Sequence, residues 1–573
     1  MSAASRPGWE RTCFFLSAVL AASGFFVPEI NPDLFWHLSA GRFMVQHQAI
    51  PRVDFLSHTM AGQPWYDFEW LTQLVYYAAY ALGGYAGFIL LRTVLLGALL
   101  AAALSLLKLF GLRDWVRGAA ALFIMKGQNL SLRPDLFSLV FFGALFWGLE
   151  SLRSGRLRPR AAHLAAGAAL FCLWANLHLG FAFGLLLIGF FTAGEFIGMS
   201  LPWVYGRGWG PGARLRAGLL LLAACVAGTL ANPYGWRIYS VLFEHTRLLP
   251  ALQELIMEWQ PADITDLGTW PYWLLVASSL AAALAHFIRT RRTAYAHLLC
   301  LAYFLVNSSI HVRHRTFFYL FGVPLTLWWL RELGLGRVWV WAGRAAGAAL
   351  AAATGFGIAT GYWPAVPLWS GTKWCSEPAF LMCRYLGAEE RLRGKKLLNA
   401  WHHGGYLGFK LYPDYRVFFD GRYIFHDLLL ENRAALRRPE SWQLHLDRYG
   451  VDVACLQRTS GYFTLEMMAG EDGRRFVGGK PFYQAYMPSE KWALVYWDDG
   501  NLVMVRRSSV DPAWLAGAEY RFLLPDVVRV DTRKKSLPAL RRELARHLRQ
   551  TKGKGLDDRA LQLWLGDLLA RKG

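Results

Sequence analysis

A carboxylate, an imidazole and a guanidinium follow one another directly after an apolar run near the start of the chain. The apolar run is 13-CFFLSAVLAASGFFV-27, and the polar stretch 31-NPDLFWHLSAGRF-43 contains Asp33, His37 and Arg42. In a helix, the spacing of four residues puts Asp33 and His37 on one face. A carboxylate held at a membrane surface can act as a general base when a substrate reaches it.

The local sequence predicts that this helix starts immediately after the apolar run. Asn31 can cap the helix, Pro32 suits its first position, and Asp33 then lies in the first turn. An acidic residue in the first turn is also favoured by the helix dipole, whatever its function. The sequence therefore leaves both a structural and a chemical role open for Asp33.

The composition predicts a membrane protein. Of the 573 residues 55% are hydrophobic and 18% are charged, and this charged fraction is low for a water-soluble chain of such length. Apolar stretches recur from the N-terminus to about residue 362 and then largely stop. We therefore expect a mainly α, polytopic membrane helical bundle followed by a C-terminal extracytoplasmic α/β domain.

About eleven spans account for the apolar stretches, if 71–107 forms a surface helix and a single crossing. The predicted spans lie near 12–28, 71–82 merging into 86–107, 118–130, 135–152, 161–176, 181–200, 217–231, 271–288, 295–309, 316–332 and 345–362. An odd number of spans puts the two ends of the chain on opposite sides of the membrane.

The net charge of +21 is distributed in a way that indicates a membrane topology and not a nucleic-acid partner. The basic residues fall largely in short loops between apolar runs and in the final tail, and such loops mark the cytoplasmic side. Examples are Arg113, Arg117, Arg153, Arg156, Arg158, Arg160, Arg207, Arg214, Arg216, Arg289, Arg291 and Arg292. The N-terminus is then cytoplasmic, and the C-terminal domain lies outside, in agreement with the span count.

The part of the chain after the last apolar run alternates short β runs with amphipathic helices. We predict strands at 397–400, 416–422 and 451–457, helices at 405–412 and 427–448, and a hairpin of 492–499 with 502–507 across Asp499-Gly500-Asn501. The predicted domains are 1–362, a transmembrane domain with a first extracytoplasmic loop at 31–70; 363–510, a soluble α/β domain; and 511–573, a basic, partly helical tail. For the tail we favour a helix that is solvated or touches lipid headgroups.

Two sets of short motifs stand out in the chain. The first set is Asp33, Ile50-Pro51, Gly62-Gln63-Pro64-Trp65, Trp70-Leu71 and Gly84-Tyr85 to Arg92. The second set is Gly404-Gly405-Tyr406-Leu407 and Asp420-Gly421-Arg422. With the first set, the start of the chain resembles the GT-C superfamily of integral-membrane glycosyltransferases, above all the branch with the aminoarabinose lipid A transferases and protein O-mannosyltransferases. With the second set, the chain also looks like bacterial relatives that have a D-x-W-H-L-x-x-G start.

The resemblance implies transfer of a sugar from a polyprenyl-phosphate-linked donor to an acceptor hydroxyl, with inversion. Such a reaction needs a carboxylate base and fixed cations that stabilise the leaving phosphate. The branch's Asp-Glu pair is Asp33-Leu34 in this chain, so a second acid must come from elsewhere in the loop. The candidate catalytic carboxylates are Asp33, Asp54 and Glu69. The candidate ligands of the donor phosphate are Arg133, Arg313, Arg315 and His314. The candidate cavity-lining residues are His37, Arg42, Glu258 and His311.

Partners, metal and location follow from the same resemblance. The expected partners are the polyprenyl-phosphate sugar donor, a glycan, lipid or protein acceptor, and membrane lipids. A divalent ion, Mg²⁺ or Mn²⁺, serves some members of the superfamily, although the spacing of His311 and His314 is too loose to define a metal site. The expected location is the bacterial plasma membrane. Two alternatives remain: a non-catalytic membrane scaffold or transport component, and a ligase or polymerase of lipid-linked glycans.

Overall fold

The computed structural model divides the chain into two compact units. One, here called the membrane unit, comprises Met1–Asn31 and Tyr66–Ser376, and the other, the soluble unit, comprises Pro32–Trp65 and Glu377–Gly573. The structure describes residues 8–23, 25, 31–201, 211–334, 345, 377, 379–458, 463–469, 475–525 and 537–551. The early segment Pro32–Trp65 thus belongs to the same compact unit as the C-terminal residues, although 66–376 separate the two in sequence.

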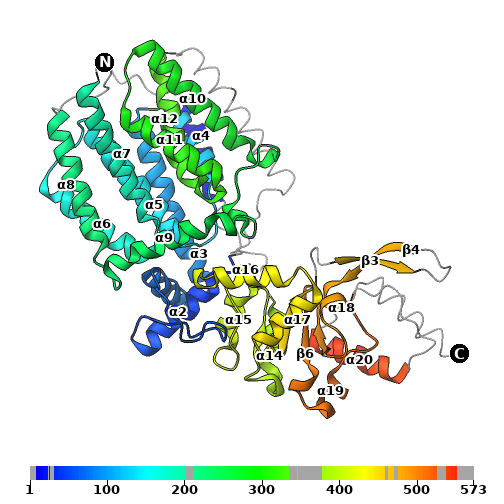
Figure 1. Ribbon diagram of the computed structural model, residues 1–573. Coiled ribbons are helices and arrows are strands. Elements are labelled where there is room, and N and C mark those ends of the chain that lie inside the picture. The colour runs from blue at the N-terminus through cyan, green and yellow to red at the C-terminus, as the bar shows by residue number, and fades with distance from the viewer. Residues whose placement is uncertain are drawn as a thin grey trace. The chain divides into compact units, whose positions relative to one another are not determined.

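The membrane unit is built from helices (Figure 1). Its longer helices are α1 (Gly8–Ser23), α3 (Trp70–Leu109), α4 (Asp114–Lys126), α5 (Asp135–Arg153), α6 (Ala161–Leu177), α7 (Phe181–Ser200), α8 (Pro211–Thr229), α9 (Ile238–Leu252), α10 (Trp270–Thr290), α11 (Tyr295–Ile310) and α12 (Arg315–Glu332). Short 3₁₀ turns join some of them, namely η2 (Gly235–Arg237), η3 (Met257–Trp259), η4 (Leu267–Thr269) and η5 (Val312–His314). Small residues let neighbouring helices approach: a Cβ added at Gly118 of α4 would lie 2.8 Å from the Phe14 Cα of α1.

Five helices in the described residues are long and apolar enough to cross a membrane. They are Trp70–Leu109, Asp135–Arg153, Phe181–Ser200, Gly212–Thr229 and Leu267–Thr290, and Ala161–Leu177 and Tyr295–Ile310 are shorter apolar helices. These helices confirm a helical membrane protein, while the number of spans stays a prediction. The last predicted span, 345–362, lies outside the described residues apart from residue 345.

The long helix α3 contains a break between the two predicted segments 71–82 and 86–107. Gly84 has φ 54° and ψ −139°, a backbone conformation that interrupts the helix and that glycine adopts without a Cβ clash. Two helical segments therefore meet at Gly84, and the second is the longer.

The soluble unit contains a four-stranded sheet in the order β1-β2-β6-β5 and a separate β3–β4 pair. The strands are β1 (Leu397–Leu398), β2 (Val453–Gln457), β3 (Phe463–Ala469), β4 (Arg475–Pro481), β5 (Trp492–Trp497) and β6 (Asn501–Arg506). The helices are α2 (Leu34–His47), α14 (Phe380–Ala388), α15 (Gly404–Leu411), α16 (His426–Ala435), α17 (Pro439–Arg448), α18 (Phe482–Tyr486), α19 (Pro512–Ala518) and α20 (Leu537–Thr551), with 3₁₀ turns η7 (Glu390–Leu392), η8 (Trp401–His403), η9 (Tyr423–Phe425) and η10 (Arg507–Ser509).

Several elements of the soluble unit match the sequence-based expectations and others differ. The β5–β6 hairpin, helix α15 and strand β2 are found where they are predicted. The predicted helix 427–448 is two helices, because Pro439 lacks an amide hydrogen and starts a new helix at α17. The predicted strand 416–422 pairs only at Val417, in an isolated parallel bridge with Ser57.

The C-terminal segment also differs from the solvated tail that we expected, because its apolar residues join the core of the soluble unit. Leu540 of α20 is 3% exposed and belongs to the same buried cluster as Trp442 and Trp492. The Glu543 carboxylate accepts hydrogen bonds from the backbone amides of Arg521, Phe522 and Leu523, at 2.8–3.0 Å. The amphipathic face of α20 therefore packs on protein.

Residues 32–65, which we expected to form a loop of the transmembrane domain, belong by their contacts to the soluble unit. Helix α2 lies beside α15 (Figure 1). Farther along, the Val417 amide donates to Leu56 O (3.2 Å), the His58 amide donates to Val417 O (3.0 Å), and the His58 ring bonds to Leu397 O (2.7 Å). This backbone pairing ties the early segment to the C-terminal residues.

Candidate functional site

Asp33 marks the start of α2, although the cap differs from the predicted one. The helix begins at Leu34, Asp33 occupies the N-cap position, and the His37 amide donates to Asp33 O at 3.4 Å. Asn31, the predicted cap, instead donates its side-chain amide to Leu132 O at 3.2 Å within the membrane unit. Asp33 is partly exposed, whereas the helix that follows it is mostly buried.

Two glycine-containing motifs of the C-terminal part pack directly against the start of α2. A Cβ added at Gly405 would lie 3.1 Å from both Pro32 O and Trp36 N, and a Cβ added at Gly421 would overlap the Asp33 carboxylate. Only glycine therefore allows this approach without a shift of the neighbouring atoms. The sequence motifs G-G-Y-L and D-G-R thus form the surface against which Asp33 and Trp36 are held.

Below this surface, Arg422 is completely enclosed between two carboxylates. Its Nε donates to Asp420 Oδ1 (2.8 Å), and its Nη2 donates to Asp420 Oδ2 (2.8 Å) and reaches Asp54 Oδ1 (2.7 Å). The guanidinium also lies 4.6 Å from the Trp65 ring centroid, in a cation–π contact. We call Asp54, Asp420 and Arg422 the buried triad.

The buried triad is electrostatically coupled. Its three side chains are at most 1% exposed. Burial raises the pKa of the Asp420 carboxyl, and Arg422 opposes that effect. Burial also disfavours the charge of Arg422, but Asp420 and Asp54 outweigh it and raise the pKa of the guanidinium. Removing Arg422 would therefore leave two buried carboxylates without their cationic partner.

Asp54, one of the predicted catalytic acids, is engaged in structural contacts on every side that the structure describes. Its carboxylate accepts hydrogen bonds from the amides of Leu56 (3.3 Å) and Ser57 (3.1 Å) and from Ser57 Oγ (2.6 Å). With Arg422 as an additional partner and 2% of its surface exposed, Asp54 is placed to fix the loop and not to reach a substrate.

The predicted cavity-lining residues of α2, His37 and Arg42, pack against other residues of the soluble unit. His37 is 2% exposed, and its ring lies 3.6 Å from that of Trp36. Arg42 lies over the Phe409 ring of α15, 4.9 Å from the centroid. Of the charged residues in 31–43, Asp33 and Arg42 are partly exposed, and Asp33 is the one that carries a carboxylate.

In the membrane unit, the structure brings three of the predicted residues, Arg133, Glu258 and Arg313, together at the ends of helices. Arg133 Nη1 lies 2.5 Å from Glu258 Oε1, and Arg313 Nη1 lies 4.0 Å from Glu258 Oε2. Arg313 Nε is also 3.8 Å from Asp135 Oδ2, at the start of α5. Arg315 follows two residues later and lies over the Tyr272 ring at 5.6 Å. We call Arg133, Arg313 and Glu258, with Asp135, the arginine cluster.

The arginine cluster is partly open to solvent. Its side-chain exposures are 15% for Arg133, 32% for Arg313 and 35% for Glu258. Partial burial disfavours the charge of Glu258, but Arg313 and Arg133 outweigh it and lower the pKa of this carboxyl. Two guanidinium groups are therefore held side by side by a carboxylate while keeping surface for an anion.

The histidine of η5, His314, is not an additional cation. Burial, followed by the charges of Arg313 and His311, lowers the pKa of His314 to about 3, so the imidazole is neutral at pH 7. Its ring packs edge-on against Phe183, with the centroids 4.9 Å apart. His311 bonds through Nδ1 to Trp259 O (3.2 Å). Among the described residues no group of three or more His, Cys, Asp or Glu side chains could hold a metal ion.

Glu69 precedes α3, in a polar network of the membrane unit. Its carboxylate lies 3.9 Å from His178 Nε2. The adjacent Trp70 donates its indole N–H to Asn176 Oδ1 (2.8 Å), and Thr72 donates to Leu177 O (2.7 Å). Glu69 is 9% exposed, so this acid is mostly enclosed by the residues that join α3 to the end of α6.

Sequence reasoning did not find the partners of Arg422. The D-G-R element is recognisable as a motif, but nothing in its spacing reveals that Asp54 and Trp65 complete its surroundings. The available signal is the tryptophan of the G-x-P-x element, which the family resemblance includes. Another member of that resemblance, Arg92, is completely buried and donates from Nη2 to Phe25 O (3.1 Å), which is a structural role.

Comparisons with known proteins give a distant structural likeness and no match in sequence. No protein-family model matches the sequence. No curated protein matches it either. Among solved structures, the fold is similar to the crystal structure of ArnT from Cupriavidus metallidurans in the apo state, with a TM-score of 0.43 and 16% sequence identity over 89% of this chain and 100% of that chain.

Proposed function

We propose that the protein is an inverting membrane glycosyltransferase that moves a sugar from a polyprenyl-phosphate donor to an acceptor hydroxyl at the extracytoplasmic face of the bacterial plasma membrane. The acceptor oxygen loses its proton as it bonds to the anomeric carbon. The bond from that carbon to the phosphate oxygen breaks, and the phosphate leaves with the electron pair. The reaction thus needs a base and fixed cations.

Asp33 is our candidate for the base. The observation that carries the proposal is that this partly exposed carboxylate is held by a buried scaffold, in which Gly421 contacts it and Arg422 is locked by two acids. Such support is what a group needs if it must keep one orientation during a reaction. Glu69, the second carboxylate of our proposal, is enclosed in its own network.

The arginine cluster is our candidate for the phosphate ligand. Guanidinium groups bind phosphate through paired hydrogen bonds, and Arg133 and Arg313 keep accessible surface beside Glu258. The cluster lies at the start of α5 and beside η5, at the ends of helices, where a lipid-borne phosphate would be found. His314 is neutral, so Arg315 is the remaining cation among the candidate phosphate ligands.

The test separates the two roles in the full-length purified protein. Binding of polyprenyl phosphate and of polyprenyl-phosphate sugars is measured by calorimetry for wild type, Asp33→Asn and Arg313→Ala. We expect Asp33→Asn to bind normally and Arg313→Ala to bind about 10- to 100-fold more weakly, since a charge-assisted hydrogen bond contributes about 1.5–3 kcal/mol. Arg292→Ala is the matched control. It removes an exposed arginine that follows the C-terminal end of α10 and does not belong to the arginine cluster.

Turnover then tests the base. With a lipid donor that binds, Asp33→Asn should lower kcat by about 10²–10⁴-fold without a matching loss of affinity. Asp427→Asn is the control for a merely dipolar effect, because Asp427 is an exposed acid in the first turn of α16. No binding of any such lipid by wild type would refute the transferase and favour the scaffold alternative.

A further inference from the structure

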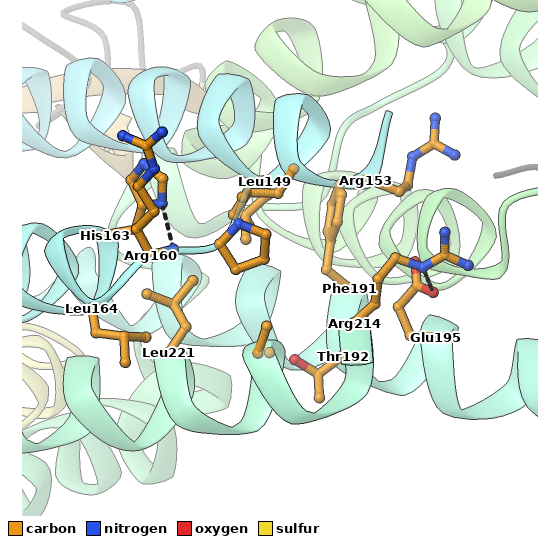
Figure 2. Close-up of a pocket in the computed structure, with 14 residues that line it drawn as sticks. Leu149, Arg153, Arg160, His163, Leu164, Phe191, Thr192, Glu195, Arg214 and Leu221 are labelled. Atoms are coloured by element: carbon orange, nitrogen blue, oxygen red, sulfur yellow. Dashed lines mark hydrogen bonds and ion pairs between the residues drawn. The ribbon is translucent and has the colours of Figure 1, made fainter. Parts of the chain in front are cut away.

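A second group of arginines lines a pocket at the other end of the membrane unit. The pocket has about 660 Å³ of empty volume, including open solvent, and lies among α5, α6, α7 and α8 (Figure 2). Arg153, Arg160 and Arg214 line it together with His163. The lining contains a single carboxylate, Glu195, among these cations.

Two of the arginines are held in place by carboxylates. Glu150 accepts from Arg153 Nε (2.8 Å) and Nη2 (2.5 Å) and is bonded to His297 Nε2 (2.9 Å), and it is 3% exposed. Arg214 Nε donates to Glu195 Oε2 at 2.6 Å, as the dashed line in Figure 2 marks. The contact with Glu195 uses Nε of Arg214. Among the described residues, no hydrogen bond or ion pair involves its two Nη groups, which can therefore bind a ligand. Both guanidinium groups are thus oriented before any ligand binds.

Arg160 differs from the other two, since it is exposed and no carboxylate of the described residues lies within ion-pair distance. It ends the loop from α5 and precedes α6, and Arg156 and Arg158 of the same loop are exposed as well. The pocket and its rim therefore carry an excess of positive charge. An anion is the complementary ligand.

Between the cations the wall of the pocket is apolar. In Figure 2, Arg160 and His163 lie on one side of Leu149 and Phe191, and Arg153 and Arg214 lie on the other. A ligand that fills the pocket must therefore be amphipathic, with an anionic group at the arginines and hydrocarbon against the leucine and phenylalanine side chains.

The position of the pocket identifies the source of such a ligand. Helix α8 is the least buried of the five candidate spans, because only 17% of its apolar stretch Gly212–Thr229 is buried in the protein. Most of its surface therefore faces outward. Arg153 is the last residue of α5, whereas Asp135 of the arginine cluster is the first. At 1.5 Å per residue the two ends are about 27 Å apart, which is close to the hydrocarbon thickness of a bilayer.

We infer that this pocket binds an anionic phospholipid of the leaflet opposite to the arginine cluster, with its phosphate at Arg160 and Arg214 and its chains along the apolar wall. Basic pockets between membrane helices are suited to such headgroups. The site is separate from the proposed donor site, because it lies at the other end of α5. It needs no catalytic activity of the protein.

The test uses delipidated full-length protein in detergent, with native mass spectrometry or calorimetry as the readout. Phosphatidylglycerol and phosphatidylcholine with identical chains are compared with inorganic phosphate and with deacylated glycerophosphoglycerol. We expect phosphatidylglycerol alone to bind well. Arg160→Ala and Arg214→Gln should each weaken it about fivefold, since a basic residue near an anionic headgroup contributes about 1 kcal/mol.

Two controls make the result decisive. Arg158→Ala removes an exposed arginine of the same loop that does not line the pocket, and it should leave the affinity within about twofold. Leu164→Gln changes the apolar wall and should weaken phosphatidylglycerol binding without creating phosphate binding. Equal binding of phosphatidylcholine, equal loss with Arg158→Ala, or competition by inorganic phosphate alone would each overturn the inference.

Discussion

The buried triad of the soluble unit and the arginine cluster of the membrane unit use the same side chains in opposite ways. In the triad a single guanidinium is enclosed by two carboxylates, and the three groups are at most 1% exposed. In the arginine cluster two guanidinium groups share Glu258, and the exposures reach 35%. The first arrangement gives every charged group a buried partner of opposite charge, whereas the second keeps cationic surface for a ligand.

This difference explains why charged residues in family motifs need not act on a substrate. Asp54, Asp420 and Arg422 stabilise the surface that holds Asp33. Their removal should mainly lower the free energy of unfolding. Arg133 and Arg313 are partly solvated, so their removal should act on binding first. The following changes test this division, from the largest expected effect to the smallest.

Arg422→Ala should destabilise the soluble unit by about 3–5 kcal/mol, because it leaves two buried carboxylates without their partner. Denaturant unfolding of the full-length protein in detergent measures the effect. Arg448→Ala is the control, since Arg448 is 70% exposed in its ion pair with Glu431, and it should cost at most about 1 kcal/mol. Equal effects of the two variants would remove the distinction between scaffold and surface charges.

Gly421→Ala should cost about 1–3 kcal/mol, since its Cβ would overlap the Asp33 carboxylate and force a shift. The same variant should lower turnover, because it displaces the proposed base. Gly517→Ala adds a methyl group in open space on α19 and should change stability by less than about 0.5 kcal/mol. Full activity of Gly421→Ala would separate Asp33 from the chemistry.

Acid should weaken the soluble unit through His403, which is 4% exposed on η8. Burial, with a smaller effect of His402, lowers the pKa of His403 to about 3. The unfolded chain therefore binds a proton below about pH 6.5 that the folded chain does not, and stability falls between that pH and about 3. The slope is at most about 1.4 kcal/mol per pH unit.

Melting curves from pH 8 to 4 check this expectation. His403→Gln should flatten the acid side of the profile, while His47→Gln, at an exposed position of α2, should follow wild type. A profile of His403→Gln that parallels wild type over the whole range would show that this imidazole is not a source of acid sensitivity.

Glu258→Gln should have the smallest effect on stability, at most about 1 kcal/mol, because its ion pairs are partly exposed. The lowered pKa of Glu258 means that its contribution is present above about pH 4.3 and is lost as the pH falls through that lowered value. Polyprenyl phosphate should bind about fivefold more tightly, since the arginines lose a competing carboxylate. Glu254→Gln is the control; weaker binding of Glu258→Gln would mean that the carboxylate itself positions the ligand.

Local sequence signals predicted local elements well. The hairpin of β5 and β6, the helix at α15 and the break in α3 follow from turn residues and glycine placement, which act over a few residues. The split between α16 and α17 was missed, although Pro439 is the residue that starts the second helix.

Long-range pairings were not predictable in the same way. The contact of Asp54 with Arg422 and the position of Gly421 against Asp33 join residues that are hundreds of positions apart, and a single sequence contains no spacing rule for them. The grouping of Arg133 and Arg313 with Glu258 was anticipated only as a set of candidates at helix ends. Their distances depend on how the helices pack, which hydropathy does not determine.

The discontinuous soluble unit has a consequence for biosynthesis. Residues 32–65 leave the ribosome early, but the residues that complete their core, from 377 onward, follow only after the whole of 66–376. At about 5–20 residues per second, the early segment waits on the order of tens of seconds with apolar side chains such as Leu34 and Phe35 uncovered. A chain cut short before the C-terminal part would keep this segment exposed, and membrane quality control would have a signal for incomplete molecules.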